Sequence, residues 1–238
     1  MAKAKTRGQT NKEDRSVWIV YVGIGLIALL LTFVLIRIGG QVSAPQTAVT
    51  PVKLDSSIPT GVTAEGAFFW GKPDAPVTID LYEDLGCQHC RDFFKNTEPP
   101  LEEQYIKTGK VRLISHPIAI VNSNSAPGAQ AVMCAADQEK YWEMRAVLFT
   151  NQDQSFSRAV LIELARSSGL DEKAFIACYD AQRHKAAVEE RSQQALRLGV
   201  TGTPTLFIGA DRYEGALSFE SGTTLGLKAI LEQKLGGG

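Results

Sequence analysis

The sequence lacks an excess of charge of either sign. Its 25 lysine and arginine residues are matched by 26 aspartate and glutamate residues, which leaves a formal net charge of −1. Nucleic-acid-binding domains carry a basic surplus or a basic patch with aromatic side chains, and neither occurs along this chain. We therefore expect no nucleic-acid partner.

Histidine and cysteine, the usual zinc ligands, are also scarce, with three histidines and four cysteines in the chain. Two of the cysteines, Cys87 and Cys90, are separated by two residues, a spacing that supplies half of a zinc site. A complete zinc site needs a second close pair of cysteine or histidine ligands, and the remaining cysteines and histidines of the chain form no such pair. We therefore favour redox chemistry over metal binding at this motif, and we expect neither a metal nor another cofactor.

The segment around these two cysteines has the pattern of a strand followed by a helix. Residues 77–82 combine β-branched, aromatic and other apolar side chains, as a buried strand does, and neither glycine nor proline follows Cys90 until Pro99. Cys87 should therefore lie at a helix N-terminus, where free N–H groups and the helix dipole stabilise a thiolate. Protonated His89 would add positive charge. We expect Cys87 to be exposed and Cys90 to be buried.

The N-terminal part of the chain is organised around a run without charge. Residues 1–16 are polar and basic, whereas residues 17–36 contain no charged side chain and are rich in leucine, isoleucine and valine. A helix of that length crosses the roughly 30 Å of hydrocarbon in a bilayer. We predict a single transmembrane anchor over residues 17–38, with the basic N-terminus in the cytoplasm and the rest of the chain outside it. A cleaved signal peptide is the alternative.

Beyond this run, the composition predicts a linker and one folded domain. Residues 39–65 contain several glycines and prolines among small polar residues, so we predict a flexible linker there. The folded domain should cover residues 66–238, and the helical periodicity over about 123–198 predicts a helical insertion within it. The other predicted elements are an edge strand, three further strands and a closing helix: residues 67–70, 111–116, 205–208, 213–215 and 225–235.

The remaining two cysteines, Cys134 and Cys178, fall on separate predicted helices of the insertion. In an oxidising compartment, cysteines of this kind are commonly bonded, and we favour a structural disulfide that joins the two helices. Loop-closure entropy puts its contribution at up to about 4 kcal/mol. Two buried free thiols, or a second redox-active pair, are the alternatives.

A second diagnostic segment is residues 199–205, GVTGTPT. Pro204 precedes an apolar run and would begin a strand, at a position where its missing N–H costs no ladder hydrogen bond. A bond between Thr203 and Pro204 at such a bend is a candidate for the cis isomer.

Taken in order, these motifs resemble the DsbA-like family of extracytoplasmic thiol–disulfide oxidoreductases, which have a thioredoxin fold. The resemblance runs over residues 67–235 and implies an α/β thioredoxin core with a helical insertion between its two halves. It also implies that Cys87 exchanges disulfides with substrate and that Cys90 resolves the intermediate. The segment of Thr203 and cis-Pro204 would lie against the disulfide and hold the substrate backbone. The dipeptide between the cysteines, Gln88-His89, would tune the redox poise; family members often have proline at the first of these positions. The segments that carry the resemblance are residues 74–79, 87–90, 134–138, 141–144 and 199–205.

The function that we favour from the sequence is an oxidase. The Cys87–Cys90 disulfide would pass to the thiols of folding secreted proteins, and a membrane quinone-linked oxidase would reoxidise the dithiol. A reductase or isomerase that uses the same cysteines is one alternative. A membrane-tethered, peptide-binding chaperone, with incidental cysteines, is the other. The direction of electron flow depends on the reduction potential, which the sequence leaves open.

Overall fold

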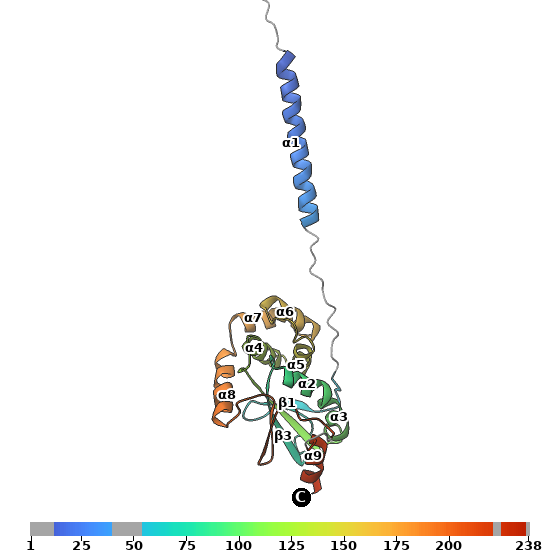
Figure 1. Ribbon diagram of the computed structural model, residues 1–238, viewed down its shortest axis with the longest axis vertical. Helices are drawn as coiled ribbons and strands as arrows, with labels where there is room; N and C mark the ends of the chain where they lie inside the picture. The colour runs from blue at the N-terminus through green and yellow to red at the C-terminus, as the bar shows by residue number, and fades with distance from the viewer. Residues whose placement is uncertain (1–11, 40–53, 221–224, 237–238) are drawn as a thin grey trace, which may run out of the picture. The chain divides into compact units, whose positions relative to one another are not determined.

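The structure is a computed structural model that describes residues 12–39, 54–220 and 225–236 (Figure 1). The chain divides into two units, residues 1–48 and 49–238. The described part of the first unit is one helix, and the second unit is a mixed sheet with helices packed on it.

The helix of the first unit, α1 (Lys12–Gly39), contains the whole uncharged run. It begins five residues before that run, within the polar segment that the sequence places ahead of it. Among the described residues, no helix has the combination of length and apolar character that crossing a membrane requires. The transmembrane anchor predicted over residues 17–38 is therefore not confirmed.

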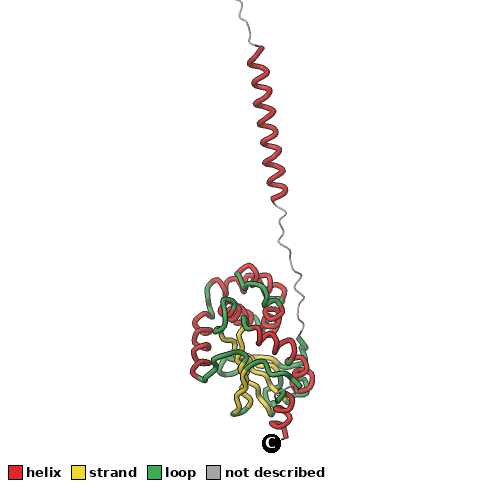
Figure 2. The backbone as a smooth tube through the Cα atoms, in the orientation of Figure 1, coloured by secondary structure: helices red, strands yellow, loops and turns green. Residues whose placement is uncertain are grey.

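The second unit is built on a six-stranded sheet in which the strand order is β1-β2-β4-β3-β5-β6. Strands β3 and β4 are parallel, and every other neighbouring pair is antiparallel. Figure 2 shows the helices gathered around these strands. The strands are β1 (Thr60–Val62), β2 (Phe68–Trp70), β3 (Val77–Asp84), β4 (Val111–Ile118), β5 (Thr205–Ile208) and β6 (Asp211–Glu214).

Strand β3 leads directly into the two-cysteine motif. Its side chains Val77, Ile79 and Leu81 are buried, whereas the residues between them are half-buried. This alternation is that of a strand with one face in the core and the other partly covered. Because β3 ends at Asp84, the motif that begins at Cys87 lies just beyond the carboxyl end of an inner strand.

The folded unit begins earlier in the chain than the sequence predicts. Ile58 is buried in the core, and β1 pairs with β2. The first residue of the predicted linker 39–65, Gly39, is the last residue of α1, and the part from residue 54 onward belongs to the domain. Strand β2 is an inner strand and not the predicted edge strand. The three residues of β1 have no apolar alternation, so their place in the sheet comes from backbone pairing alone. The remainder of that predicted linker, residues 40–53, lies outside the described residues.

The helix after the motif ends before the two consecutive prolines, Pro99 and Pro100. Helix α2 (Gln88–Asn96) stops at Thr97, and α3 (Glu98–Leu101) follows, with both prolines in its first turn. A missing N–H needs no partner there, which is why proline is tolerated at helix starts. A π-helical turn, η1 (Glu102–Ile106), continues the segment.

The predicted helical insertion is confirmed as five helices, and one further helix closes the chain. Two of the five begin with a side-chain N-cap. The Ser157 hydroxyl accepts a hydrogen bond from the backbone N–H of Val160, and the Asp171 carboxylate accepts one from Ala174. The helices are α4 (Ser125–Ala136), α5 (Tyr141–Thr150), α6 (Arg158–Ser167), α7 (Glu172–Asp180), α8 (Lys185–Arg197) and the closing α9 (Leu227–Gly236).

Candidate active site

The start of α2 positions the two cysteines of the motif. Cys87 is the residue that precedes the helix, with extended backbone angles (φ −83°, ψ 123°), and Cys90 lies in the first helical turn. Both are free thiols. The backbone N–H of Asp84 donates to Cys90 Sγ at 3.4 Å, so the last residue of β3 contacts the second sulfur.

The prediction that Cys87 is exposed is wrong. Its exposed fraction is 4%, against 1% for Cys90. The cause is the segment before β5, which packs on the motif: Cys87 Sγ lies 3.2 Å from the carbonyl oxygen of Thr203. The Thr203–Pro204 peptide bond is cis, and both residues are buried. This contact joins residues 116 positions apart. It agrees with the place that the family resemblance implies for the Thr203–Pro204 segment, whereas the local sequence pattern around Cys87 gives no sign of it.

The surroundings of Cys87 favour its thiolate. The pKa of Cys87 is lowered to about 6, chiefly by a hydrogen bond from the Cys90 thiol. The Thr203 side chain lowers this pKa further, as do the backbone N–H groups of Cys90 and His89, whereas burial of the sulfur raises it. His89 thus contributes through its backbone, whereas its side chain is 75% exposed and lies 4.0 Å from Asp92. Gln88, the other residue of the dipeptide, is also exposed.

Cys90 has the opposite character. Burial raises its pKa well above the ordinary value, and its hydrogen bond to the Cys87 sulfur and the negative charges of Cys87 and Glu83 raise it further. Near neutral pH one sulfur is therefore a thiolate and the other a thiol that donates to it. In such a pair the first cysteine is the nucleophile and leaving group, because disulfide exchange proceeds through the thiolate.

The loop between β3 and α2 is held by the chain that follows β4. The buried carboxylate of Asp84 accepts hydrogen bonds from the backbone N–H groups of Gly86, Ile120 and Val121, at 2.8, 2.8 and 3.0 Å. The side chain of Asn122 donates to the Gly86 carbonyl at 2.7 Å. A Cβ atom at position 86 would come within 2.3 Å of Asn122 Oδ1, so this close approach requires glycine.

The helical insertion also supports the loop, through Gln152. Its side-chain N–H group donates to the carbonyl oxygens of Leu85 and Cys87, at 2.7 and 2.9 Å. Gln152 is buried, and it is the residue by which the segment between α5 and α6 fixes the position of the nucleophilic cysteine. Nothing in its local sequence distinguishes it from a surface glutamine, so its role at the site was not predicted.

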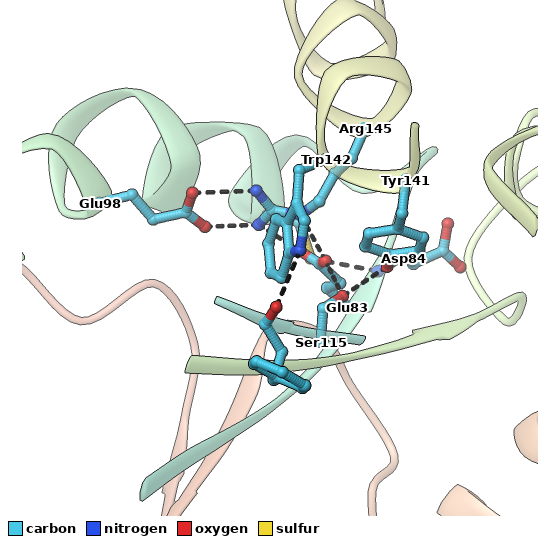
Figure 3. A network of polar contacts seen from close by, with 9 residues as sticks. Glu83, Asp84, Glu98, Ser115, Tyr141, Trp142 and Arg145 are labelled. Atoms are coloured by element: carbon cyan, nitrogen blue, oxygen red, sulfur yellow. Dashed lines mark hydrogen bonds and ion pairs between the residues drawn. The ribbon is translucent and has the colours of Figure 1, made fainter. Parts of the chain in front are cut away.

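Figure 3 shows a buried ionic network around Arg145. One of its members, Glu83, is among the charges that raise the pKa of Cys90. Arg145 lies between two glutamates: its Nε and Nη2 atoms donate to Glu83 at 2.6 and 2.7 Å, and its Nη1 and Nη2 atoms donate to Glu98, the former at 2.9 Å. The Ser115 hydroxyl bonds Glu83 and lies 2.6 Å from the Tyr141 hydroxyl. All five residues are buried. The sequence gives no sign that Arg145 is buried with Glu83 and Glu98. Buried charges need partners, which is why these three side chains lie together.

The other two cysteines are bonded to one another. Cys134 in α4 and Cys178 in α7 form a disulfide with a Cα–Cα distance of 5.8 Å. This is the pairing favoured from the sequence, and it joins two helices of the insertion.

Comparisons with known proteins agree with this fold. The family model described as thioredoxin matches residues 63–225. The chain is 28% identical over 167 residues to Na(+)/H(+) antiporter NhaA 3 of Salinispora tropica, a match that covers 69% of this chain and 25% of the antiporter. It is 26% identical over 149 residues to the probable disulfide bond formation protein D of Bacillus anthracis, covering 59% of this chain and 69% of that protein.

A solved structure has the same architecture. The oxidised form of BdbD from Bacillus subtilis superposes with a TM-score of 0.63 at 22% identity, over 71% of this chain and 92% of BdbD. This chain spans about a quarter of the length of the antiporter that it matches. The family match, the parallel β3–β4 pair with the Cys87–Cys90 helix between its two strands, and the helical insertion lead to one conclusion. The chain belongs to the thioredoxin family and has the DsbA-like form of its fold.

Proposed function

We propose that this protein is an extracytoplasmic thiol–disulfide oxidoreductase that acts through Cys87 and Cys90. The observation that carries the proposal is the contrast between the two thiols, with the pKa of Cys87 lowered to about 6 and that of Cys90 raised. The similarity to a probable disulfide bond formation protein supports it.

The exchange follows from this contrast. A substrate thiolate attacks Cys87 Sγ of the oxidised pair, the Cys87–Cys90 bond breaks, and Cys90 leaves and takes a proton. The second substrate thiolate then attacks the substrate sulfur of the mixed disulfide, and Cys87 leaves as a thiolate. The substrate loses two electrons and the protein gains them. A low Cys87 pKa speeds the last step, because thiols of lower pKa are better leaving groups.

The favoured direction of exchange is oxidation of the substrate. A pKa of about 6 instead of about 8.5 stabilises the reduced protein by about 1.4 kcal/mol at pH 7, which corresponds to about 30 mV in a two-electron couple. The second candidate is a reductase or isomerase, since a pKa of about 6 is nearer to the value of about 7 in thioredoxin than to about 3.5 in DsbA.

The reduction potential decides between these candidates. The protein is equilibrated in glutathione buffers that leave Cys134–Cys178 oxidised, quenched with acid, alkylated and measured by mass. A potential near about −120 mV supports the oxidase, and one near about −270 mV supports the reductase. Full biological activity of Cys87→Ser would overturn both and favour the peptide-binding chaperone.

Thr203 and Pro204 are proposed to hold the substrate backbone beside Cys87. Thr203 lies within contact distance of the reactive sulfur, so a peptide whose cysteine reaches Cys87 passes over this segment. The proposed substrates are folding secreted proteins with free thiols, and the proposed recycling partner is a membrane quinone-linked oxidase. Trapping mixed disulfides with Cys90→Ala in cells would identify both kinds of partner.

The extracytoplasmic location is supported by the Cys134–Cys178 disulfide, because such bonds persist in oxidising compartments. Attachment to a membrane through the N-terminal segment stays a prediction from the sequence. Alkaline carbonate extraction of cells that express the full chain tests it: an anchored protein stays in the membrane pellet, and release into the supernatant would rule the anchor out.

A further inference from the structure

The helical insertion holds a cluster of metal-ligating side chains apart from the Cys87–Cys90 motif. The sulfurs of Cys134 and Cys178 and a ring nitrogen of His184 all lie within 4.8 Å of one another. Asp137 adds a carboxylate, whose oxygens are 3.0 and 3.1 Å from His184 Nε2, and one of them is 3.5 Å from Cys178 Sγ. The two cysteines are buried, whereas the side chains of His184 and Asp137 are 18% and 32% exposed. A metal ion could therefore reach the cluster from the solvent.

Three separate segments bring these groups together. Cys134 and Asp137 are three positions apart on α4 and its C-terminal cap, which puts them on one helix face. Cys178 lies in α7, and His184 is the residue that precedes α8. No short-spaced pair of cysteine and histidine marks this cluster in the sequence, because each ligand lies next to its partners only after the helices pack.

We propose that the reduced Cys134–Cys178 pair forms a Zn²⁺ site with His184 and Asp137. A dithiol reductant transfers two electrons to the disulfide and becomes a disulfide itself, while two protons pass to the cysteine sulfurs. Zn²⁺ then displaces both thiol protons, without electron transfer, and binds two thiolates, a neutral imidazole and a carboxylate. In the oxidised protein the sulfurs are bonded to one another, so this site does not form.

The donor set and its spacing fit zinc. Tetrahedral Zn²⁺ takes these ligand types at about 2.3 Å for sulfur and about 2.0–2.2 Å for nitrogen and oxygen, which separates neighbouring ligand atoms by roughly 3.3–3.8 Å. Asp137 already lies 3.0 Å from His184 and 3.5 Å from Cys178. Three anionic ligands would leave one surplus negative charge around the dication. The guanidinium of Arg183, 2.7 Å from Asp137 Oδ2, offsets that charge.

The proposed metal site would replace the disulfide as the crosslink between helices. Under reducing conditions α4, α7 and the start of α8 would stay joined through Zn²⁺, and oxidation would expel the metal and restore the disulfide. This inference does not rest on the function proposed for Cys87 and Cys90, so it is tested in a chain that lacks both of those thiols.

The experiment uses the full-length Cys87→Ser/Cys90→Ser protein, reduced with a phosphine under anaerobic conditions and titrated with Zn²⁺ alone. We expect one Zn²⁺ per reduced chain, no comparable binding by the oxidised chain, and release of the metal on reoxidation with diamide. Co²⁺ should give the visible absorption of a tetrahedral, thiolate-bound ion. Circular dichroism before and after metal addition records whether the reduced insertion is folded, and it also detects folding that is driven by the metal.

Variants in the same background assign the ligands. His184→Ala and Asp137→Asn should each weaken Zn²⁺ binding by at least about tenfold, and Cys134→Ser/Cys178→Ser should abolish it. Asp180→Asn is the matched control, because that exposed carboxylate is paired with Arg158, and it should leave the affinity unchanged. Absence of stoichiometric binding overturns the proposal. So does binding that survives the double serine change, or binding that neither His184→Ala nor Asp137→Asn weakens.

Discussion

Lowering the pH from 7 to 4 should reduce the free energy of unfolding of the reduced protein by an amount that has no counterpart in the oxidised protein. The Cys87 thiol has a pKa of about 6 in the folded chain, against about 8.5 in an unfolded chain. A folded pKa below the unfolded value stabilises the fold fully above the unfolded value, and this stabilisation disappears as the pH falls through the folded pKa. The contribution is about 1.4 kcal/mol at pH 7 and close to zero at pH 4.

The oxidised form has no Cys87 thiolate, so the stability difference between the two forms isolates this effect. Closing the short Cys87–Cys90 loop stabilises the oxidised form by about 2 kcal/mol, at any pH. The two contributions nearly balance at pH 7, and the oxidised form should be clearly the more stable at pH 4. The raised pKa of Cys90 has no effect in this range, because an unfolded cysteine is also protonated below about pH 8.

Urea unfolding of both redox forms at pH 7 and pH 4, with Cys134–Cys178 oxidised throughout, measures the change. We expect the difference between the forms to shift by about 1.4 kcal/mol in favour of the reduced form at the higher pH. A thiol with a pKa near about 3.5, as in DsbA, would give about 4 kcal/mol. Reduced Cys87→Ser is the control and should lose this pH dependence. A difference that stays constant between the two pH values would refute the assignment of Cys87 as a stabilised thiolate.

Three further predictions follow from the contacts of the domain. Gln152→Ala removes the side-chain donor from the carbonyl groups of Leu85 and Cys87, of which the latter still accepts the backbone N–H of Arg91. Urea unfolding should therefore show a loss of about 1–3 kcal/mol, and a thiolate absorbance titration should show an altered pKa for Cys87; an unchanged pKa would mean that this glutamine has no influence on the thiol. Arg145→Met leaves two buried glutamates without their cationic partner and should lower the free energy of unfolding by about 3–5 kcal/mol. Changing both glutamates to glutamine as well should recover part of this loss. A loss below about 1 kcal/mol would mean that the network is not buried as described. Cys134→Ala/Cys178→Ala should lower the free energy of unfolding by up to about 4 kcal/mol while thiol exchange at Cys87 persists, and loss of exchange in a folded variant would assign this disulfide a redox role.

The sequence by itself determined the features that depend on neighbouring residues. The alternation in residues 77–82 and the absence of helix breakers after Cys90 were enough to locate a strand, a helix and a cysteine at the helix start, because side-chain periodicity reports which face of an element is buried. The helical insertion was predicted for the same reason. The caps at Ser157 and Asp171 are local features of the same kind, because capping is a contact over three residues.

The tertiary structure alone decided the features that depend on distant segments. Cys87 is buried because Thr203 packs on it from 116 positions away, and Gln152 contacts the motif from 65 positions away. Strand β1 has no pattern of its own and joins the sheet through backbone hydrogen bonds. The same holds for the ion pairs of Arg145 and for the approach of His184 to the disulfide. Such contacts form only when whole helices and strands pack, and no local spacing encodes which polar side chains will then face one another.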